Sequence, residues 1–267
     1  MYKLIALDMD GTLLNDEKKI TEKTKKAISE ARNNGKYVVL CSGRPIEGIY
    51  RYLDELNMNT EDDYVISFNG SLVQHADNKK VIGKKTLIGE DLKYLFNISR
   101  ELGVNIHGFS KEGCITPKIS KYTELEGKIN GITVKEFDYT KIEDKEDISK
   151  VMMIDEPEIL QKAIDNLPED LYEKYTVVRS APYFLEFLNK DANKGTGVGM
   201  LAEHLGIKKE EVICVGDAGN DLHMIEYAGL GVAMKNATDD VKEKASYITK
   251  SNNEDGVAHV IEKFMLK

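Results

Sequence analysis

Short apolar runs and amphipathic segments alternate along the first third of the chain. Three apolar runs are bounded by turn residues, as is typical of strands buried on both faces: 4–7, 37–41 and 65–68. Apolar residues recur at helical spacing between these runs, which predicts helices over 24–33 and 46–56. Thr21 suits the N-cap of the first helix, and Gly35 suits the residue after its end. This order predicts a βαβαβ unit with parallel strands.

The last third of the chain repeats this rhythm. The pattern predicts two helices and three strands: 195–205 and 222–228, then 212–215, 231–234 and 247–249. Because both ends of the chain carry one pattern, we predict a single α/β core with a doubly wound, Rossmann-like parallel sheet. This core is expected to comprise residues 1–82 and 185–267.

The middle of the chain has a different pattern. Helices and short strands are mixed there, with a polar interruption at 139–149: helices over 92–102 and 159–167, strands over 104–109, 150–154 and 175–179. Such a mixture is typical of a compact α+β domain inserted into another domain. We therefore predict an inserted α+β cap domain over 83–184, with hinges near 82–83 and 183–185.

Composition limits the class of protein. The 267 residues are 41% hydrophobic and 31% charged, and no apolar run approaches the roughly 20 residues needed to cross a bilayer. The N-terminus has neither a secretory nor a transit-peptide pattern, so a soluble, cytoplasmic protein is expected. The net charge of -9 argues against nucleic acid or an anionic membrane as a partner. Cys41, Cys114 and Cys214 lack metal-type spacing and are expected to be buried thiols.

Four polar clusters follow apolar runs, at the positions where strands or connecting segments are expected to end. They are Asp8-Met9-Asp10-Gly11-Thr12, Ser42-Gly43-Arg44, Lys194 and Asp217-Ala218-Gly219-Asn220-Asp221. In an open parallel sheet, ligands bind outside the carboxyl ends of the strands, so clusters distant in sequence can meet in one crevice. The pattern therefore predicts a single site at this edge of the sheet.

Paired carboxylates in the first cluster indicate a cation. Residues two apart on an extended chain point the same way, so Asp8 and Asp10 are expected to face one crevice. At about 4 Å and an effective dielectric constant near 20, two like charges repel by roughly 4 kcal/mol, unless one group is protonated or a cation lies between them. Asp217 and Asp221 add candidate ligands, and a few carboxylates with substrate oxygens are how Mg²⁺ is usually held. We predict a magnesium site.

The same clusters contain groups that bind an anion such as phosphate. Gly11 permits close approach of the backbone, Thr12 and Ser42 offer hydroxyl groups, and free amides around Gly43 can form an anion nest. Lys194 is expected at the N-terminus of a helix, where a bound anion is favoured.

Each cluster alone has a plainer interpretation. Asp-x-Asp-Gly also occurs in ordinary turns and calcium loops, and a lone Lys194 could be a solvated helix residue. Asn220 or Asp221 could simply cap the following helix. The joint order of the clusters favours a site over these alternatives.

Together the motifs give the sequence a resemblance to a known family. It resembles the haloacid dehalogenase-like (HAD) phosphatases, in the Cof-type group with a large C2 cap inserted after the third strand, and most closely the YidA-type sugar phosphatases. The likeness covers the whole chain, including the cap segments 150–157 and 180–186. The four motifs taken together are highly specific, and none of their positions departs from the family pattern.

The resemblance implies a role for each matching residue. Asp8 matches the nucleophile that forms an aspartyl-phosphate, and Asp10 matches the general acid/base. Five residues match positions that bind the phosphoryl group or support its loop: Thr12, Ser42, Gly43, Lys194 and Asn220.

A magnesium ion is also implied by the resemblance. Asp8, Asp10 and Asp217 match its ligands, and Asp221 matches a supporting acid. Asn69-Gly70 matches the short family motif that precedes the cap.

The implied activity is Mg²⁺-dependent hydrolysis of small phosphorylated metabolites, with sugar phosphates as the first expectation. Two alternatives share the aspartyl-phosphate: a phosphomutase or phosphotransferase, and a signalling module switched by phosphorylation of Asp8. The carboxylate of Asp10 argues against the signalling module, because it should promote rapid hydrolysis. The oligomeric state is not indicated.

The cap is expected to supply substrate specificity by closing over the crevice. Candidates for contacts with the leaving group are His107, Lys118, Tyr122 and Arg179. Packing or surface exposure is the commoner role for such residues.

Overall fold

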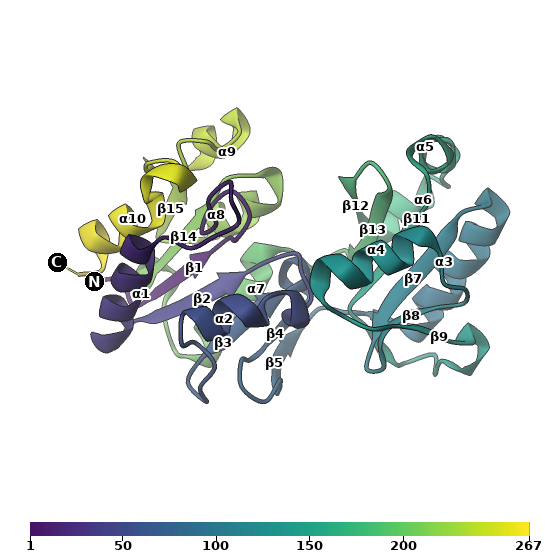
Figure 1. Ribbon diagram of the computed structural model, residues 1–267, viewed down its shortest axis with the longest axis horizontal. Coiled ribbons are helices and arrows are strands. Elements are labelled where there is room, and N and C mark those ends of the chain that lie inside the picture. Colours follow the sequence, from purple (N-terminus) through teal and green to yellow (C-terminus); the bar gives the residue numbers. More distant parts are fainter. Residues whose placement is uncertain (267) are drawn as a thin grey trace. The chain divides into compact units, whose positions relative to one another are not determined.

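The structure is a computed structural model that describes residues 1–266. Its chain forms two compact units (Figure 1). The core unit comprises Met1–Lys84 and the chain from Asn193 onward, and the inserted unit comprises Lys85–Ala192. The chain of one unit is thus inserted into that of the other.

The second junction differs from its predicted position. The sequence pattern places it near residue 184, whereas the structure places it after Ala192. The reason is strand β13 (Phe184–Asn189), which pairs antiparallel with β11 (Lys150–Ile154) and β12 (Tyr175–Ala181) and so belongs to the sheet of the inserted unit.

An eight-stranded sheet forms the centre of the core unit. In spatial order its strands are β16 (Tyr247–Ile248), β15 (Leu230–Ala233), β14 (Val212–Gly216), β1 (Leu4–Leu7), β2 (Tyr37–Cys41), β3 (Tyr64–Ser67), β4 (Leu72–His75) and β5 (Val81–Lys84). Neighbours from β16 to β3 pair in parallel, and β3, β4 and β5 pair antiparallel. Strand β1 therefore lies between β2, its neighbour in sequence, and β14, which is distant in sequence.

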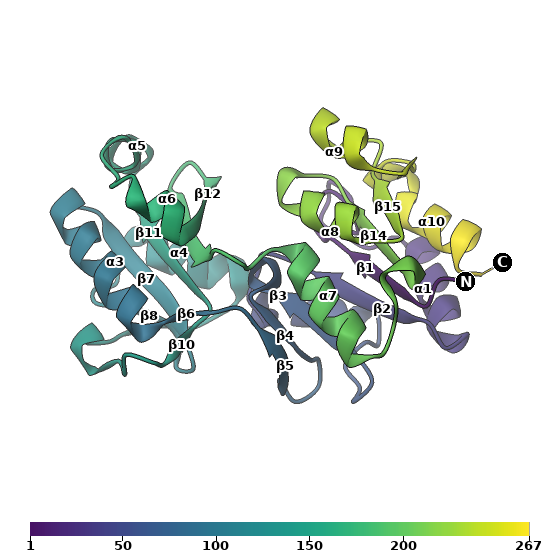
Figure 2. The ribbon, with the colours of Figure 1, turned by 180° about the vertical axis from the view of Figure 1, so that it is seen from behind.

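Helices cover both faces of this sheet (Figures 1 and 2). One face contacts α1 (Glu22–Asn33), α2 (Tyr50–Glu55), α9 (Asp239–Lys244) and α10 (Gly256–Phe264), and the other contacts α7 (Lys194–His204). The short helix α8 (Leu222–Tyr227) contributes Ile225 to the first face and Met224 to the second. Alternate residues of β1 show the division, because Ile5 and Leu7 pack on the first face and Leu4 and Ala6 on the second. Burial on both faces explains the continuous apolar runs and confirms the predicted doubly wound α/β core.

Some local elements of the core unit differ from prediction. The helix predicted over 46–56 is divided into a 3₁₀ turn (Ile46–Gly48) and the short helix α2. The β4–β5 hairpin, α9 and α10 are additional to the predicted elements. The residues of β5 are exposed or half-buried, so this strand lacks the apolar run that marks a buried strand.

The inserted unit is built on a six-stranded sheet. Its spatial order is β12, β13, β11, β7 (Asn105–Ser110), β8 (Gly113–Thr116) and β9 (Val134–Glu136). Its pairs are antiparallel except for β8 with β9. Strands β6 (Leu87–Ile88) and β10 (Asp147–Ile148) form a separate small sheet.

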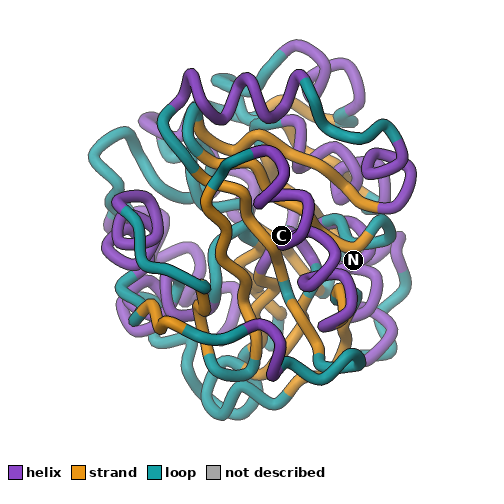
Figure 3. The backbone as a smooth tube through the Cα atoms, turned by 90° about the vertical axis from the view of Figure 1, so that its right-hand side faces the viewer, coloured by secondary structure: helices purple, strands orange, loops and turns teal. Residues whose placement is uncertain are grey.

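One face of this large sheet packs against α3 (Gly89–Leu102), α5 (Pro157–Asp165) and α6 (Asp170–Lys174). A further helix, α4 (Lys121–Asn130), connects β8 to β9 in the chain. Helices and strands are mixed along this unit, which agrees with the predicted α+β character. Both kinds of element recur throughout the chain (Figure 3, helices purple and strands orange). Within residues 1–266, no helix combines the length and the apolar character that crossing a membrane requires.

Candidate active site

The central strand β1 brings Asp8 to the carboxyl edge of the core sheet. The Asp8 amide donates a hydrogen bond of 3.0 Å to the carbonyl of Val215 on β14, so the parallel pairing continues up to this residue. The flanking strands β2 and β14 end immediately before Ser42 and Asp217. Parallel pairing therefore brings three predicted site residues to one edge of the sheet.

The loop after β1 approaches the loop after β14 closely. Gly11 has a φ of +88°, and a Cβ atom at this position would lie 2.3 Å from Asp217 Oδ2. The neighbouring Thr12 hydroxyl donates to Asp217 Oδ1 at 2.7 Å. A residue without a Cβ atom is required at Gly11, both for its backbone conformation and for this contact. Thr12 thus supports the Asp217 side chain.

Lys194 is the first residue of α7, and its side chain is fully buried. Asn193 caps the helix by accepting a hydrogen bond of 2.9 Å from the Thr196 amide. The Lys194 ammonium donates to Asp8 Oδ1 and, at 2.6 Å, to Asp221 Oδ1. A buried charge needs such partners, so the two carboxylates fix the ammonium beside Asp8.

Both oxygens of Asp221 have partners within the protein. Its Oδ1 accepts from Lys194, and its Oδ2 accepts from the backbone amides of Asp217 and Ala218 at 2.8 and 3.0 Å. The side chain is fully buried. Asp221 is therefore suited to orient the ammonium and the loop after β14.

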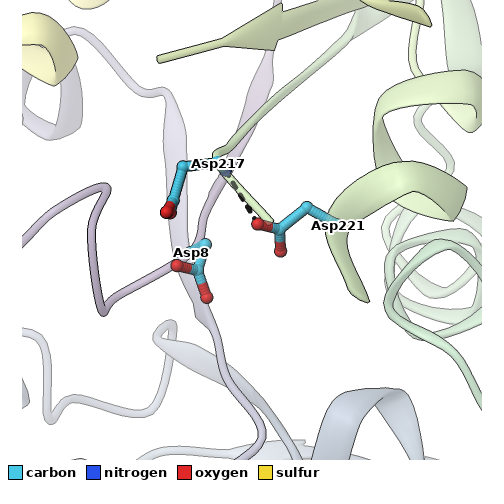
Figure 4. A group of neighbouring side chains, drawn as sticks. All are labelled: Asp8, Asp217 and Asp221. Atoms are coloured by element: carbon cyan, nitrogen blue, oxygen red, sulfur yellow. Dashed lines mark hydrogen bonds between the residues drawn. The ribbon is translucent and has the colours of Figure 1, made fainter. Parts of the chain in front are cut away.

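Asp8, Asp217 and Asp221 form an acidic cluster (Figure 4). Each contributes a carboxylate oxygen, and these oxygens lie within 4.8 Å of one another. Three carboxylates against the one ammonium of Lys194 leave a net negative charge when all four groups are ionised. Such oxygens are the ligands that Mg²⁺ prefers, and Asp8 and Asp217 are the members suited to hold it, because Asp221 is engaged by hydrogen bonds.

The pKa shifts in the cluster reflect burial first and then this excess of negative charge. Burial and the neighbouring carboxylate of Asp221 raise the pKa of Asp8, even though Lys194 acts in the opposite direction. Burial also raises the pKa of Asp217, against the hydrogen bond from Thr12. Burial alone would lower the pKa of Lys194, but Asp221 and Asp8 raise it above its ordinary value, so the ammonium keeps its proton. A cation would relieve the remaining repulsion.

The second predicted motif, Ser42-Gly43-Arg44, lies next to the turn that follows β3. The Asn69 amide donates to the Ser42 carbonyl at 2.9 Å, and a Cβ atom on Gly43 would lie 3.0 Å from Asn69 Nδ2. Asn220 donates from Nδ2 to Asn69 Oδ1 at 3.1 Å. The structure thus brings together Ser42, Gly43, Asn69 and Asn220, which the sequence places in three separate motifs.

Comparison with known sequences decides the family. The sequence model of the haloacid dehalogenase-like hydrolases matches residues 5–261. The chain belongs to this family. It is accordingly a hydrolase of the haloacid dehalogenase-like type, as its motifs predict.

Three relatives of this HAD-like hydrolase illustrate the range of the family. YxeH of Bacillus subtilis (strain 168), provisionally named a phosphatase, is 48% identical over 271 residues, which cover 100% of this chain and 99% of the relative. YcsE of the same organism, named a 5-amino-6-(5-phospho-D-ribitylamino)uracil phosphatase, is 32% identical over 264 residues, which cover 99% and 96%. The structure of the HAD subclass IIB sugar phosphatase BT4131 has a TM-score of 0.80 at 25% identity, covering 99% of this chain and 100% of that one.

Asp10 lies apart from the acidic cluster of this HAD-like hydrolase. Its carboxylate accepts hydrogen bonds from Arg44 and from Lys18, the latter at 2.8 Å. Burial alone would raise the pKa of Asp10, but Lys18 and Arg44 lower it overall. The expectation that the Asp10 side chain joins Asp8 and Asp217 in one acidic group is therefore wrong for this structure, because two cations bind its carboxylate elsewhere.

Several residues around the HAD motifs escaped the sequence prediction. Asn236 donates to the Gly11 carbonyl at 2.8 Å, and the amide of Asn252 donates to Asn236 Oδ1 at 3.0 Å. Asn252 also donates from Nδ2 to the Leu14 carbonyl at 3.1 Å. These amides hold the loop after β1 in place. They follow β15 and β16 at the same sheet edge, so the strand-end rule that identified Asp217 also applies to them.

Candidates in the inserted unit are mostly engaged in other contacts. His107 is fully buried, with its Nε2 3.1 Å from Met152 Sδ, so of the two roles considered for it the structure shows packing. The Tyr122 hydroxyl donates to Glu156 at 2.7 Å. Arg179 donates to the Pro182 carbonyl at 2.7 Å.

Proposed function

We propose that this HAD-like hydrolase is a magnesium-dependent phosphatase that acts on small phosphorylated metabolites, with sugar phosphates as the first substrate class, through an aspartyl-phosphate on Asp8. One observation carries the proposal: a buried Lys194 ammonium pairs with Asp8 inside an acidic cluster at the carboxyl edge of the sheet. The relatives support phosphatase chemistry, and the name of the structural relative BT4131 favours sugar phosphates.

The nucleophile must overcome the repulsion between two anions. An oxygen of Asp8 forms a bond to phosphorus while the bond from phosphorus to the leaving oxygen breaks. Lys194 lowers the repulsion between Asp8 and the phosphoryl group, because its ammonium is held against Asp8 before the substrate arrives. Its position is fixed by Asp221, so the charge needs no rearrangement during the reaction.

Asp10 is the residue suited to move protons in this scheme. In the first step it gives a proton to the leaving oxygen, so an alcohol departs. The negative charge of the bound phosphoryl group favours the protonated form of Asp10 and so opposes Lys18 and Arg44, which lower its pKa in the free protein. In the second step it accepts a proton from water, whose oxygen bonds to phosphorus while the bond between phosphorus and Asp8 breaks. Inorganic phosphate leaves, and both carboxyl groups return to their starting states.

The donor set fits Mg²⁺ as the cofactor. Asp8 and Asp217 would hold the ion, since they are carboxylates of one cluster at the edge where the phosphoryl group would bind. When bound, Mg²⁺ supplies positive charge that offsets the cluster and the phosphoryl oxygens. The excess negative charge of the cluster is the structural feature that this cofactor explains.

A substrate panel with and without metal tests the function. Purified protein is incubated with sugar phosphates, flavin mononucleotide, pyridoxal phosphate and 4-nitrophenyl phosphate, in Mg²⁺ or in EDTA, and both free phosphate and isomerised products are measured. We expect free phosphate in Mg²⁺ and none in EDTA. Asp8→Asn should abolish release, because its amide is a much poorer nucleophile than the carboxylate.

Three results would contradict this function. Absence of phosphate release from the whole panel would exclude a general phosphatase, and full activity of Asp8→Asn would exclude the covalent route. Isomerised product without free phosphate would replace hydrolysis by a phosphomutase reaction.

A further inference from the structure

Arg44 binds the carboxylate of Asp10 through two nitrogens. Its Nε lies 3.1 Å and its Nη2 2.8 Å from Asp10 Oδ2, and Nη2 also lies 3.0 Å from Oδ1. Lys18 adds a contact of 2.8 Å to Oδ1. A planar guanidinium bound in this way fixes both the position and the rotation of a carboxylate, which a single ammonium contact does not.

The Arg44 residue is itself held by the surrounding structure. Its amide donates to Ser42 Oγ at 3.2 Å, and its carbonyl accepts from the Phe68 amide at 3.1 Å. Its guanidinium carbon lies 5.9 Å from the centre of the Tyr52 ring, and its side chain is only 18% exposed. The Arg44 residue is therefore held in place, unlike a mobile surface arginine.

We propose that Arg44 is a positioning residue for Asp10, which it holds in orientation for proton transfer to the leaving group. This inference rests on the proposed phosphatase function. As the bond between phosphorus and the leaving oxygen breaks, the proton passes from the Asp10 carboxyl group to that oxygen. The negative charge left on Asp10 meets a guanidinium that is already in place, so Arg44 stabilises the product of the transfer.

Leaving groups that differ in their need for a proton test this role. An alkyl ester such as glucose 6-phosphate needs its leaving oxygen protonated, whereas 4-nitrophenolate departs as a stable anion. Arg44→Ala is expected to lower kcat/KM about 10- to 100-fold for glucose 6-phosphate and less than about threefold for 4-nitrophenyl phosphate. Phenyl phosphate, with an intermediate leaving group, should fall between them. The parameter kcat/KM is chosen because it reports the steps up to departure of the leaving group.

Three further variants separate positioning from a general effect. In an Asp10→Asn background, Arg44→Ala should cost less than about threefold on any ester, because its partner is already lost. Arg44→Lys keeps the charge but loses the contact through two nitrogens. Its ratio of kcat/KM for glucose 6-phosphate to that for 4-nitrophenyl phosphate should lie between the ratios of the wild type and Arg44→Ala. It also replaces Arg44→Ala if that variant does not fold. Arg32→Ala is the matched control, since it removes a similar ion pair with Asp63, at 2.6 and 2.8 Å. It should leave the ratio of kcat/KM for the two esters unchanged.

Two outcomes would overturn the inference. Equal losses on the alkyl and aryl esters would mean that Arg44 binds the phosphoryl group directly. Unchanged kcat/KM on both would make the contact with Asp10 irrelevant to catalysis. A wild-type protein that releases no phosphate would instead refute the proposed function, and that result is read before any variant is made.

Discussion

Glycines shape the candidate site as much as its charged residues do. Gly11 brings the loop after β1 against Asp217, and Gly70, with a φ of +94°, brings the turn after β3 against the start of α7. A Cβ atom on Gly70 would lie 2.0 Å from the Asn193 carbonyl oxygen. A single methyl group at either position would push apart segments that the chemistry requires together.

The close approach at Gly11 leads to a prediction about metal affinity. Gly11→Ala should displace Asp217 and weaken activation by Mg²⁺ by about 10- to 100-fold, as loss of support for a ligand does in other metal sites. The half-saturating Mg²⁺ concentration for phosphate release measures this. Gly35→Ala is the matched control, because Gly35 has a φ of +71° and a Cβ atom there would meet nothing within 4 Å. Equal effects of both substitutions would point to backbone strain alone.

The sequence predicts the charged residues of the site better than their partners. Asp8, Lys194 and Asp217 stand out because each follows an apolar run or a helix cap. The position of the Asp10 side chain could not be predicted, because it depends on Arg44 and Lys18, whose spacing in the chain carries no periodic signal. Which cations the Asp10 carboxylate contacts can be read only from the three-dimensional structure.

At the scale of elements, the sheet of the inserted unit carries a buried titratable group. His107 lies on β7 and is fully buried, opposite Met152 of β11. Burial, with a smaller contribution from Lys150, lowers the pKa of His107 to about 3. The ordinary value in an unfolded chain is about 6.5, so between these values the unfolded chain binds a proton that the folded one does not.

This difference predicts that acid destabilises the fold. The contribution of His107 to stability is present above pH about 6.5 and is lost progressively as the pH falls, by about 2 kcal/mol between pH 7 and pH 5. His107→Gln should reduce the loss in unfolding free energy between these two pH values by that amount, measured by urea unfolding. His223→Gln, at a position less buried than His107, is the control. Identical pH dependence of wild type and His107→Gln would contradict the prediction.

Elements with a buried face are the ones that the sequence predicts well. Strands β1, β2 and β11 have the predicted bounds. The first two are continuous apolar runs, and β11 is four apolar residues preceded by the buried Lys150. The sequence pattern ends the inserted unit too early. Both the apolar pattern and the resemblance to the family continue through β13, so neither of them marks a boundary there. Apolar alternation identifies a strand, but not the sheet in which it pairs.

At the scale of the whole molecule, the core unit is assembled from both ends of the chain. Met1–Lys84 contributes β1 to β5, and the chain from Asn193 onward contributes β14 to β16. The predicted metal ligands Asp8 and Asp217 belong to different ends. An ion bound between them would therefore link the two segments as well as serve the chemistry.

Metal binding should therefore stabilise the fold. At a Mg²⁺ concentration about 100 times the dissociation constant, we expect the unfolding free energy to rise by about 2.7 kcal/mol, with a higher Tm that EDTA reverses. Asp217→Asn should remove most of this shift. Asp62→Asn, an exposed acid of the same unit, should retain it. A Tm that does not respond to Mg²⁺ in the wild type would contradict the assignment of the site.

The place of β1 between β2 and β14 also has a consequence for biosynthesis. A ribosome makes β1 before β14, so one hydrogen-bonding edge of β1 has no partner until residues 212–216 have been made. In that interval, an apolar strand with one open edge is available to pair with other chains. Contacts of such long sequence separation also form slowly, so we expect the nascent protein to depend on protection by chaperones until β14 emerges.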